Sequence, residues 1–194
     1  MVALPKAKMT ANEYLRWSGT QDGGRFELVG GEVVAMSPET LRHVRLKNEI
    51  WLVLRNALAR AGSSCSAFGD GVGIQIDEKT VREPDVSVQC APFEQDSLLL
   101  DQPVVVVEVV SLSSVRSDTG AKVADYFRVP SICHYLIVDP YSSNVIHHAR
   151  ASGSETIGTR ILTAGPIELV PPGVVVQVEE LLGLSPAAAA EESP

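Results

Sequence analysis

The sequence has few cysteines, and those present are not spaced for a zinc knuckle or a redox pair. They are Cys65, Cys90 and Cys133, and no two of them stand in a CxxC arrangement. Wide, odd-numbered spacing of this kind is typical of ordinary buried thiols. We therefore expect three reduced, partly buried cysteines.

Long apolar runs are also missing from the chain. A membrane-spanning helix needs about 20 consecutive apolar residues, and the apolar runs here are only a few residues long. The first eight residues contain two lysines and no apolar core of signal-peptide length. We expect a cytoplasmic protein that has no membrane partner.

The chain lacks the positive charge of a protein that coats nucleic acid. Its net charge is −8, and nonspecific phosphate binding requires a positive field. The charge is uneven, however, because the first 60 residues carry a net +3 and the remainder −11. The basic excess lies largely on one segment, which contains Arg42, Arg45, Lys47, Arg55 and Arg60. Both a solvated helix face and a phosphate-binding face remain open for this segment.

What the chain does have is the composition of a folded protein. Hydrophobic residues make up 45% and charged residues 21% of its 194 residues, which suits one domain with a sizeable core. We expect a single domain over residues 1–184. Residues 185–194 are rich in Ala and Glu without a periodic apolar face, and we expect them to form a disordered tail.

Periodicity predicts a mixture of helices and strands, and hence an α/β (α+β) protein. The capping-box pattern from Thr10 to Glu13 begins a short helix that ends near Trp17. Ser37 and Pro38 are expected to open the longest helix, whose apolar stripe continues to Ala61, and a third helix is expected over 117–128. Strands are expected at 26–29, 32–36, 72–76, 85–88, 103–110, 134–138, 145–149, 156–163 and 174–178.

Glu108 is the most informative residue in the sequence. It interrupts a run of valines that has the pattern of a central strand covered on both faces. A carboxylate in such surroundings needs a cation, or its pKa must rise. Ionisable groups forced into apolar surroundings cluster at functional sites, although a purely structural pair with a lysine is the alternative.

Asp85 is the second candidate, because it opens a strand that precedes the Glu108 strand. If the two strands pair in one sheet, both carboxylates converge on one point. Two hard oxygen ligands on a rigid sheet, completed by water and phosphate, describe a Mg²⁺ site. Taken alone, an Asp that follows Pro84 is a common turn residue.

Residues from about Met9 to Ala149 resemble the Uma2 family of restriction-endonuclease-like proteins in the PD-(D/E)XK nuclease superfamily. The resemblance rests on the order and spacing of many short pieces rather than on one long motif. These pieces are Glu27-Leu28-Val29-Gly30-Gly31-Glu32, Met36-Ser37-Pro38 with His43, Pro84-Asp85-Val86, Val107-Glu108-Val109-Val110-Ser111, Asp118 with Lys122 and Tyr126, and Tyr135-Leu136-Ile137-Val138-Asp139-Pro140.

The resemblance implies a restriction-endonuclease-like fold, a mixed central sheet flanked by helices. It also implies that Asp85 and Glu108 hold Mg²⁺, for which Mn²⁺ could substitute, and that Glu27 adds a further carboxylate. The lysine usual in the superfamily stands two residues after the acid, where this chain has Val110. Lys122 on the following helix matches the displaced lysine of this family.

Several of these residues also have simpler interpretations. His43 at the start of the long helix is a catalytic residue, a phosphate contact or a cap. Asp118, Lys122 and Asp125 lie three or four residues apart and would also suit a surface ion-pair cluster. The adjacent His147 and His148 on one strand point to opposite faces and are not expected to share a metal.

These observations favour a Mg²⁺-dependent endonuclease that hydrolyses phosphodiester bonds of DNA, with catalytic residues Asp85, Glu108 and Lys122. A homodimer is expected, because two sites related by a two-fold axis suit the cleavage of both strands. The acidic net charge and the missing lysine at Val110 instead favour a catalytically silent relative that binds nucleic acid or a partner protein. A hydrolase of another phosphate ester is the third alternative.

Overall fold

The computed structural model describes residues 4–111, 120–151 and 156–184. The helices are α1 (Ala11–Ser18), α2 (Leu41–Arg60), α3 (Lys122–Tyr126) and α4 (Val178–Leu181). The strands are β1 (Phe26–Val29), β2 (Glu32–Ala35), β3 (Ser66–Gly69), β4 (Ile74–Asp77), β5 (Thr80–Arg82), β6 (Val86–Gln89), β7 (Pro103–Val109), β8 (His134–Asp139), β9 (Asn144–Arg150), β10 (Ile157–Leu162), β11 (Pro166–Leu169) and β12 (Val174–Gln177).

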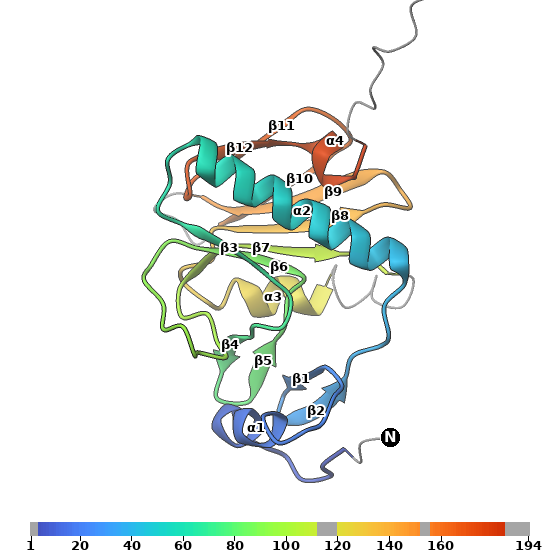
Figure 1. Ribbon diagram of the computed structural model, residues 1–194, viewed down its shortest axis with the longest axis vertical. Coiled ribbons are helices and arrows are strands. Elements are labelled where there is room, and N and C mark those ends of the chain that lie inside the picture. Colours follow the sequence, from blue (N-terminus) through green and yellow to red (C-terminus); the bar gives the residue numbers. More distant parts are fainter. Residues whose placement is uncertain (1–3, 112–119, 152–155, 185–194) are drawn as a thin grey trace, which may run out of the picture.

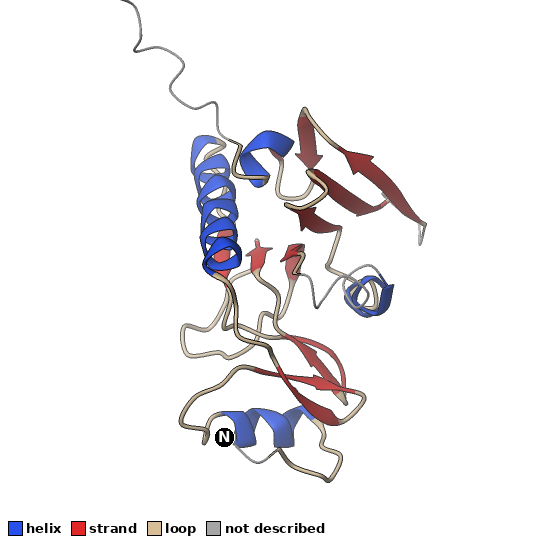
Figure 2. Cartoon of the chain, turned by 90° about the vertical axis from the view of Figure 1, so that its right-hand side faces the viewer, coloured by secondary structure: helices blue, strands red, loops and turns tan. Residues whose placement is uncertain are grey.

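A six-stranded sheet in the order β10-β9-β8-β7-β6-β3 forms the centre of the molecule. Strands β7 and β8 are parallel, and the other neighbours in this sheet are antiparallel. Helix α2 covers one face, together with α4 and the β11–β12 hairpin, while α3 lies against the other (Figures 1 and 2). The predicted mixed central sheet flanked by helices is therefore confirmed.

The valine run forms β7, and every residue of this strand is buried. Because side chains alternate along a strand, Val105, Val107 and Val109 pack into the core beneath α2. Val106 and Val110 pack into the separate core on the α3 face. Burial of each such side chain contributes about 1.5–3 kcal/mol, so β7 anchors both cores. Glu108 lies between Val106 and Val110 in this alternation and therefore faces α3.

A second, smaller sheet has the order β2-β1-β5-β4 and packs against α1 (Figure 1). Strands β1 and β2 form the predicted hairpin, and Gly30 and Gly31 at its turn both have positive φ values, +58° and +88°. A type of turn that needs positive φ at both central positions favours glycine there. The capping box at Thr10 and Glu13 is likewise present at the start of α1.

The long helix begins later than the sequence predicted. Its N-cap is Thr40, whose hydroxyl accepts a hydrogen bond from the His43 amide, rather than Ser37. Ser37 and Pro38 instead lie in an extended segment before α2. The Thr40 hydroxyl supplies the acceptor that the amides of the first helical turn require, so Ser37 is not needed as the N-cap.

Short elements account for the other differences. The tight β4–β5 connection places Thr80 opposite Asp77 at the start of β5, a strand of three residues that was not predicted. Strands β3 and β11 and helix α4 were not predicted, because four residues carry too little periodicity to be recognised. Of the helix expected over 117–128, the structure describes α3; Asp118 and the tail at 185–194 lie outside the described residues.

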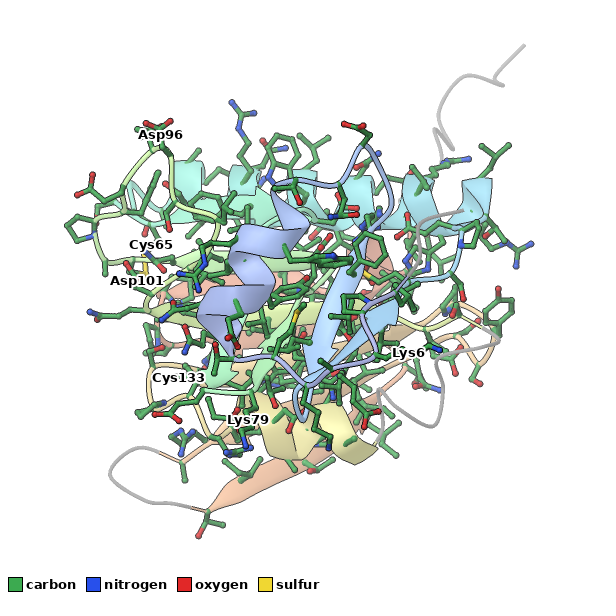
Figure 3. All side chains as sticks on the ribbon, turned by 90° about the horizontal axis from the view of Figure 1, so that it is seen from below. Lys6, Cys65, Lys79, Asp96, Asp101 and Cys133 are labelled. Carbon is green, nitrogen blue, oxygen red and sulfur yellow. A yellow bond between two sulfur atoms is a disulfide. The ribbon has the colours of Figure 1, made fainter. Side chains whose placement is uncertain are left out.

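The expectation of three reduced thiols is wrong for two of the cysteines. Cys65 and Cys90 form a disulfide, visible as the sulfur–sulfur bond at Cys65 in Figure 3. Strands β3 and β6 are antiparallel and pair with Ser66 opposite Gln89. Cys65, just before Ser66, therefore stands opposite Cys90, just after Gln89. A separation of 25 residues in the sequence hid this cross-strand position. Cys133 remains a free, half-buried thiol.

No helix among the described residues is both long enough and apolar enough to cross a membrane.

Candidate functional site

A cavity of about 480 Å³ is lined by residues of both sheets and by the start of α2. Its walls come from β1, β2, β5, β7, α2, α3 and the segment that precedes α2. Its ionisable lining residues are Glu27, Glu39, His43, Arg82, Asp85, Glu108, Lys122 and Tyr141. The structure thus places all five residues predicted from the sequence, Glu27, His43, Asp85, Glu108 and Lys122, around one cavity.

Asp85 and Glu108 come together because of the β6–β7 register. Val86 stands opposite Val107 in this antiparallel pair, so the next position places Asp85 opposite Glu108. Asp85 Oδ2 accepts a hydrogen bond of 2.7 Å from the Val109 amide, which fixes its side chain at the strand end. Both carboxylates are buried, with 5% of Asp85 and 4% of Glu108 exposed.

Glu108 is held by two side chains from α3. Lys122 Nζ lies 2.9 Å from Glu108 Oε1, and the Tyr126 hydroxyl donates a hydrogen bond of 2.6 Å to the same oxygen. Burial and the adjacent Glu108 carboxylate raise the pKa of Tyr126 well above its usual value, so the phenol stays protonated as a donor. One helical turn separates the two residues, which places both on the face of α3 that meets β7.

Glu27 belongs to a second ion-pair network on the same cavity wall. Its carboxylate accepts hydrogen bonds from Arg82 Nη1, at 2.8 Å, and from the Glu83 amide, at 3.1 Å. Arg82 also binds Asp125 of α3 through two nitrogens. Burial opposes the charge on Arg82, but Glu27 and Asp125 outweigh it and raise the pKa of the guanidinium. Arg82 therefore connects the small sheet to α3 and neutralises two acids. Lys122 is a second cation near Glu27, with its Nζ 4.0 Å from the Glu27 carboxylate.

His43 pairs with the other carboxylate of the strand pair. Its Nε2 atom lies 3.2 Å from Asp85 Oδ1. Burial opposes the charged imidazole, but the hydrogen bond and charge of Asp85 outweigh this effect and raise the pKa of His43. Burial also opposes the charged form of Asp85 and so raises its pKa. The hydrogen bond and charge of His43 and the Val109 amide lower this pKa more, so the net shift is downward. The two groups therefore each favour the charged form of the other.

The donor set around Asp85 fits a divalent cation. One ligand atom each from Glu39, His43 and Asp85 lie within 4.8 Å of one another. Carboxylate oxygens and an imidazole nitrogen are ordinary ligands of divalent ions, and a cavity that is rich in acids favours such an ion further.

The basic segment on α2 divides into several environments. Lys47 is buried, where it forms ion pairs with Glu39 and Asp70. Arg45 pairs with Glu49 on the helix surface, and Arg42 and Arg55 lie over the rings of Tyr141 and Trp51. These contacts account for four of the five basic residues without a ligand.

Other lesser candidates have structural partners. His147 hydrogen-bonds to His134 in the core, whereas His148 contacts Thr159, so the two adjacent histidines do point apart. Asp139 accepts backbone hydrogen bonds from Tyr141 and Ser142 and is a turn residue.

Sequence reasoning did not single out Glu39 and Arg82, which line the cavity, and gave no role to Tyr126, which contacts Glu108. Glu39 precedes His43 by four residues, a spacing that would have placed both at the start of one helix. Arg82 was overlooked because β5 was not recognised as a strand. Tyr126 was part of the family pattern, but its contact with Glu108 depends on how α3 packs on β7.

Comparison with known proteins identifies relatives over most of the chain. The sequence profile of the Uma2 family, described as "Putative restriction endonuclease", matches residues 11–186. One uncharacterized protein of Synechocystis sp. is 30% identical over 154 residues, which cover 78% of this chain and 80% of that protein. A second is 24% identical over 166 residues, 84% of this chain and 92% of its own.

A solved structure shares the fold. It is described as a "putative nuclease belonging to DUF820" from Anabaena variabilis and superimposes with a TM-score of 0.70 at 14% identity, covering 91% of this chain and 98% of that one. The family match extends beyond the residues that carried the resemblance and includes the β11–β12 hairpin and α4. The chain belongs to the Uma2 family.

Proposed function

We propose that this protein is a divalent-metal-dependent endonuclease that hydrolyses phosphodiester bonds of DNA. The observation that carries the proposal is the arrangement of Asp85, Glu108 and Lys122 around one cavity, from the residue before β6, from β7 and from α3. Membership of the Uma2 family supports the same reaction class.

Asp85 and Glu108 would hold the metal, for which Mg²⁺ is the expected ion and Mn²⁺ a substitute. A bound divalent ion would lower the pKa of a water and neutralise charge on a phosphate oxygen. The β6–β7 register places the two acids opposite one another, and the Val109 amide holds Asp85 in place. Glu108 lies on β7 and Asp85 directly precedes β6, so both acids are attached to rigid strands, as a site of fixed geometry requires.

Lys122 is the proposed catalytic cation. Its ammonium lies 2.9 Å from Glu108 at the cavity wall, where it would orient the attacking water or stabilise negative charge in the transition state. Tyr126 positions Glu108 by donating to the same oxygen. Arg82 adds a second buried positive charge on this wall, beside Glu27. These two cations offset the acids and would favour the approach of a phosphate.

The catalytically silent alternative rested on the absence of a lysine at Val110. The placement of Lys122 beside Glu108 supports the active alternative, because the cation missing from β7 is supplied by α3. A homodimer remains part of the proposal, as does DNA as the partner and substrate.

Cleavage assays test the proposal directly. Supercoiled plasmid, single-stranded DNA and RNA are incubated with the protein and Mg²⁺, Mn²⁺ or EDTA. We expect plasmid nicking with either metal, none in EDTA, and none from Asp85→Asn or Glu108→Gln. Asp96→Asn is the matched control, because Asp96 is exposed on the loop between β6 and β7 (Figure 3) and does not line the cavity. Nicking by Glu108→Gln at the wild-type rate, or none by the wild type with either metal, would contradict the proposal.

A further inference from the structure

We propose that His43 is itself a metal ligand, with Asp85 and Glu39, and that the site therefore selects a first-row transition ion over Mg²⁺. The inference rests on the proposed function in one respect only, namely that a divalent ion binds at Asp85. It adds a nitrogen ligand that the family resemblance does not assign.

The first observation is the spacing of the ligand atoms. His43 Nε2 lies 3.2 Å from Asp85 Oδ1. Two ligands that bind one ion at about 2.1 Å, at right angles to each other, stand about 3.0 Å apart. The imidazole and the carboxylate are therefore already separated as two neighbouring ligands of one ion would be.

The second observation is that both side chains are fixed before any ion binds. The backbone of His43 is held in the first turn of α2, where its amide donates to the Thr40 hydroxyl, and its imidazole is hydrogen-bonded to Asp85. Asp85 is held through its other oxygen by the Val109 amide. The two side chains are only 12% and 6% exposed, so little freedom remains to be lost on binding.

Glu39 supplies the third ligand. Its Oε1 atom lies 3.8 Å from His43 Nε2, and all three ligand atoms fit within 4.8 Å of one another. Arg25 and Lys47 both form ion pairs with Glu39, Arg25 through Oε1 and Lys47 through Oε2. These cations also compete with a metal for its charge, so Glu39 is the weakest of the three ligands.

A nitrogen ligand changes which ion the site prefers. Mg²⁺ binds oxygen ligands and retains its waters, whereas imidazole favours transition ions. An Asp85–Glu108 pair alone would offer two carboxylates and no such preference. The Glu108 oxygen Oε1 is engaged by Lys122 and Tyr126, while Asp85 Oδ1 faces His43. The ligand set on the His43 side of Asp85 thus differs in chemistry from the set on the Glu108 side.

Electron paramagnetic resonance with Mn²⁺ tests the inference on the full-length chain. Electron spin-echo modulation detects a nitrogen bound to Mn²⁺, and labelling the histidines with ¹⁵N shifts that signal without any mutation. We expect nitrogen modulation in the wild type, its ¹⁵N shift in the labelled protein, and its loss in His43→Gln. His148→Gln is the matched control, because His148 contacts Thr159 away from the cavity.

Metal titrations give the second readout. We expect Mn²⁺ to bind at least about tenfold more tightly than Mg²⁺, and this ratio to fall in His43→Gln but not in His148→Gln. Tight Mn²⁺ binding without nitrogen modulation in the wild type would overturn the role of His43 while leaving a metal-dependent nuclease intact. Failure of Asp85→Asn to weaken Mn²⁺ binding, or no Mn²⁺ binding at all, would overturn both the inference and the metal site of the proposed function.

Discussion

Replacement of Lys122 by methionine separates the structural role of this residue from its proposed catalytic role. The lysine is 7% exposed, and its ammonium lies 2.9 Å from a carboxylate that is 4% exposed. Methionine fills similar space but carries no charge. Removal of one partner from a buried ion pair costs about 3–5 kcal/mol, because the other charge stays buried without it.

The expected loss is large enough to measure without ambiguity. At about 2–4 °C per kcal/mol for a chain of this size, a loss of 3 kcal/mol lowers the Tm by roughly 6–12 °C in EDTA. The double variant Lys122→Met with Glu108→Gln should recover much of this loss, since it leaves no unpaired charge. Lys79→Met is the control, because Lys79 is exposed and its replacement should leave the Tm unchanged (Figure 3).

Activity gives the second half of the experiment. Plasmid nicking by Lys122→Met, assayed below its Tm, should fall by about a hundredfold or more, as expected for loss of a transition-state cation or general base. An unchanged Tm in EDTA would refute the buried ion pair. Wild-type nicking by a destabilised but folded variant would leave the pair standing as a structural feature and refute catalysis by Lys122.

Three further predictions concern the metal, the core and assembly. Glu108→Gln should weaken divalent-metal binding in calorimetry, and equal binding by the variant and the wild type would remove Glu108 from the site. Burial, then the charges of His134 and Arg160, lower the pKa of His147 to about 4. The unfolded chain therefore binds a proton at this histidine near pH 6.5, whereas the folded chain binds it only near pH 4. Stability should be complete above about pH 6.5 and fall by up to about 3 kcal/mol towards pH 4, and urea unfolding should show a shallower loss for His147→Gln. The protein should be a homodimer by light scattering at micromolar concentration, where a monomer mass would reject this prediction.

The sequence predicted best where one residue type repeated over a long stretch. The valine run predicted β7 as a buried central strand, and the apolar stripe of α2 predicted its long helix, because both patterns extend over several turns or pairs. Short elements such as β5 lack that redundancy, and β5 carries Arg82. The cavity was therefore predicted with three of its four acids but without Arg82, one of the two buried cations that balance them.

Contacts between distant residues formed the second limit. The Cys65–Cys90 disulfide follows from the β3–β6 register. That register involves β3, a strand of four residues that is too short to be predicted from the sequence. Glu39 was missed for a related reason, since the start of α2 was placed three residues too early and Glu39 fell inside the expected helix. In the structure it precedes the Thr40 cap and lines the cavity.

The position of the lysine follows from the packing of β7. Val110 lies on the same face of the strand as Glu108, and it is 3% exposed within the core that contains Tyr126 and Ile137. A lysine there would have to bury its ammonium in that apolar cluster or displace the helix that covers it, and either would be costly. Lys122 reaches the same carboxylate from α3 while lining the cavity, so its charge lies beside the site rather than in the apolar cluster. The apolar Val110 and the lysine at position 122 therefore complement each other, because β7 supplies the acid and α3 supplies the cation. A chain with a lysine at both positions would place two ammonium groups on one face of the sheet, and we expect Val110→Lys to destabilise the fold without restoring activity to Lys122→Met.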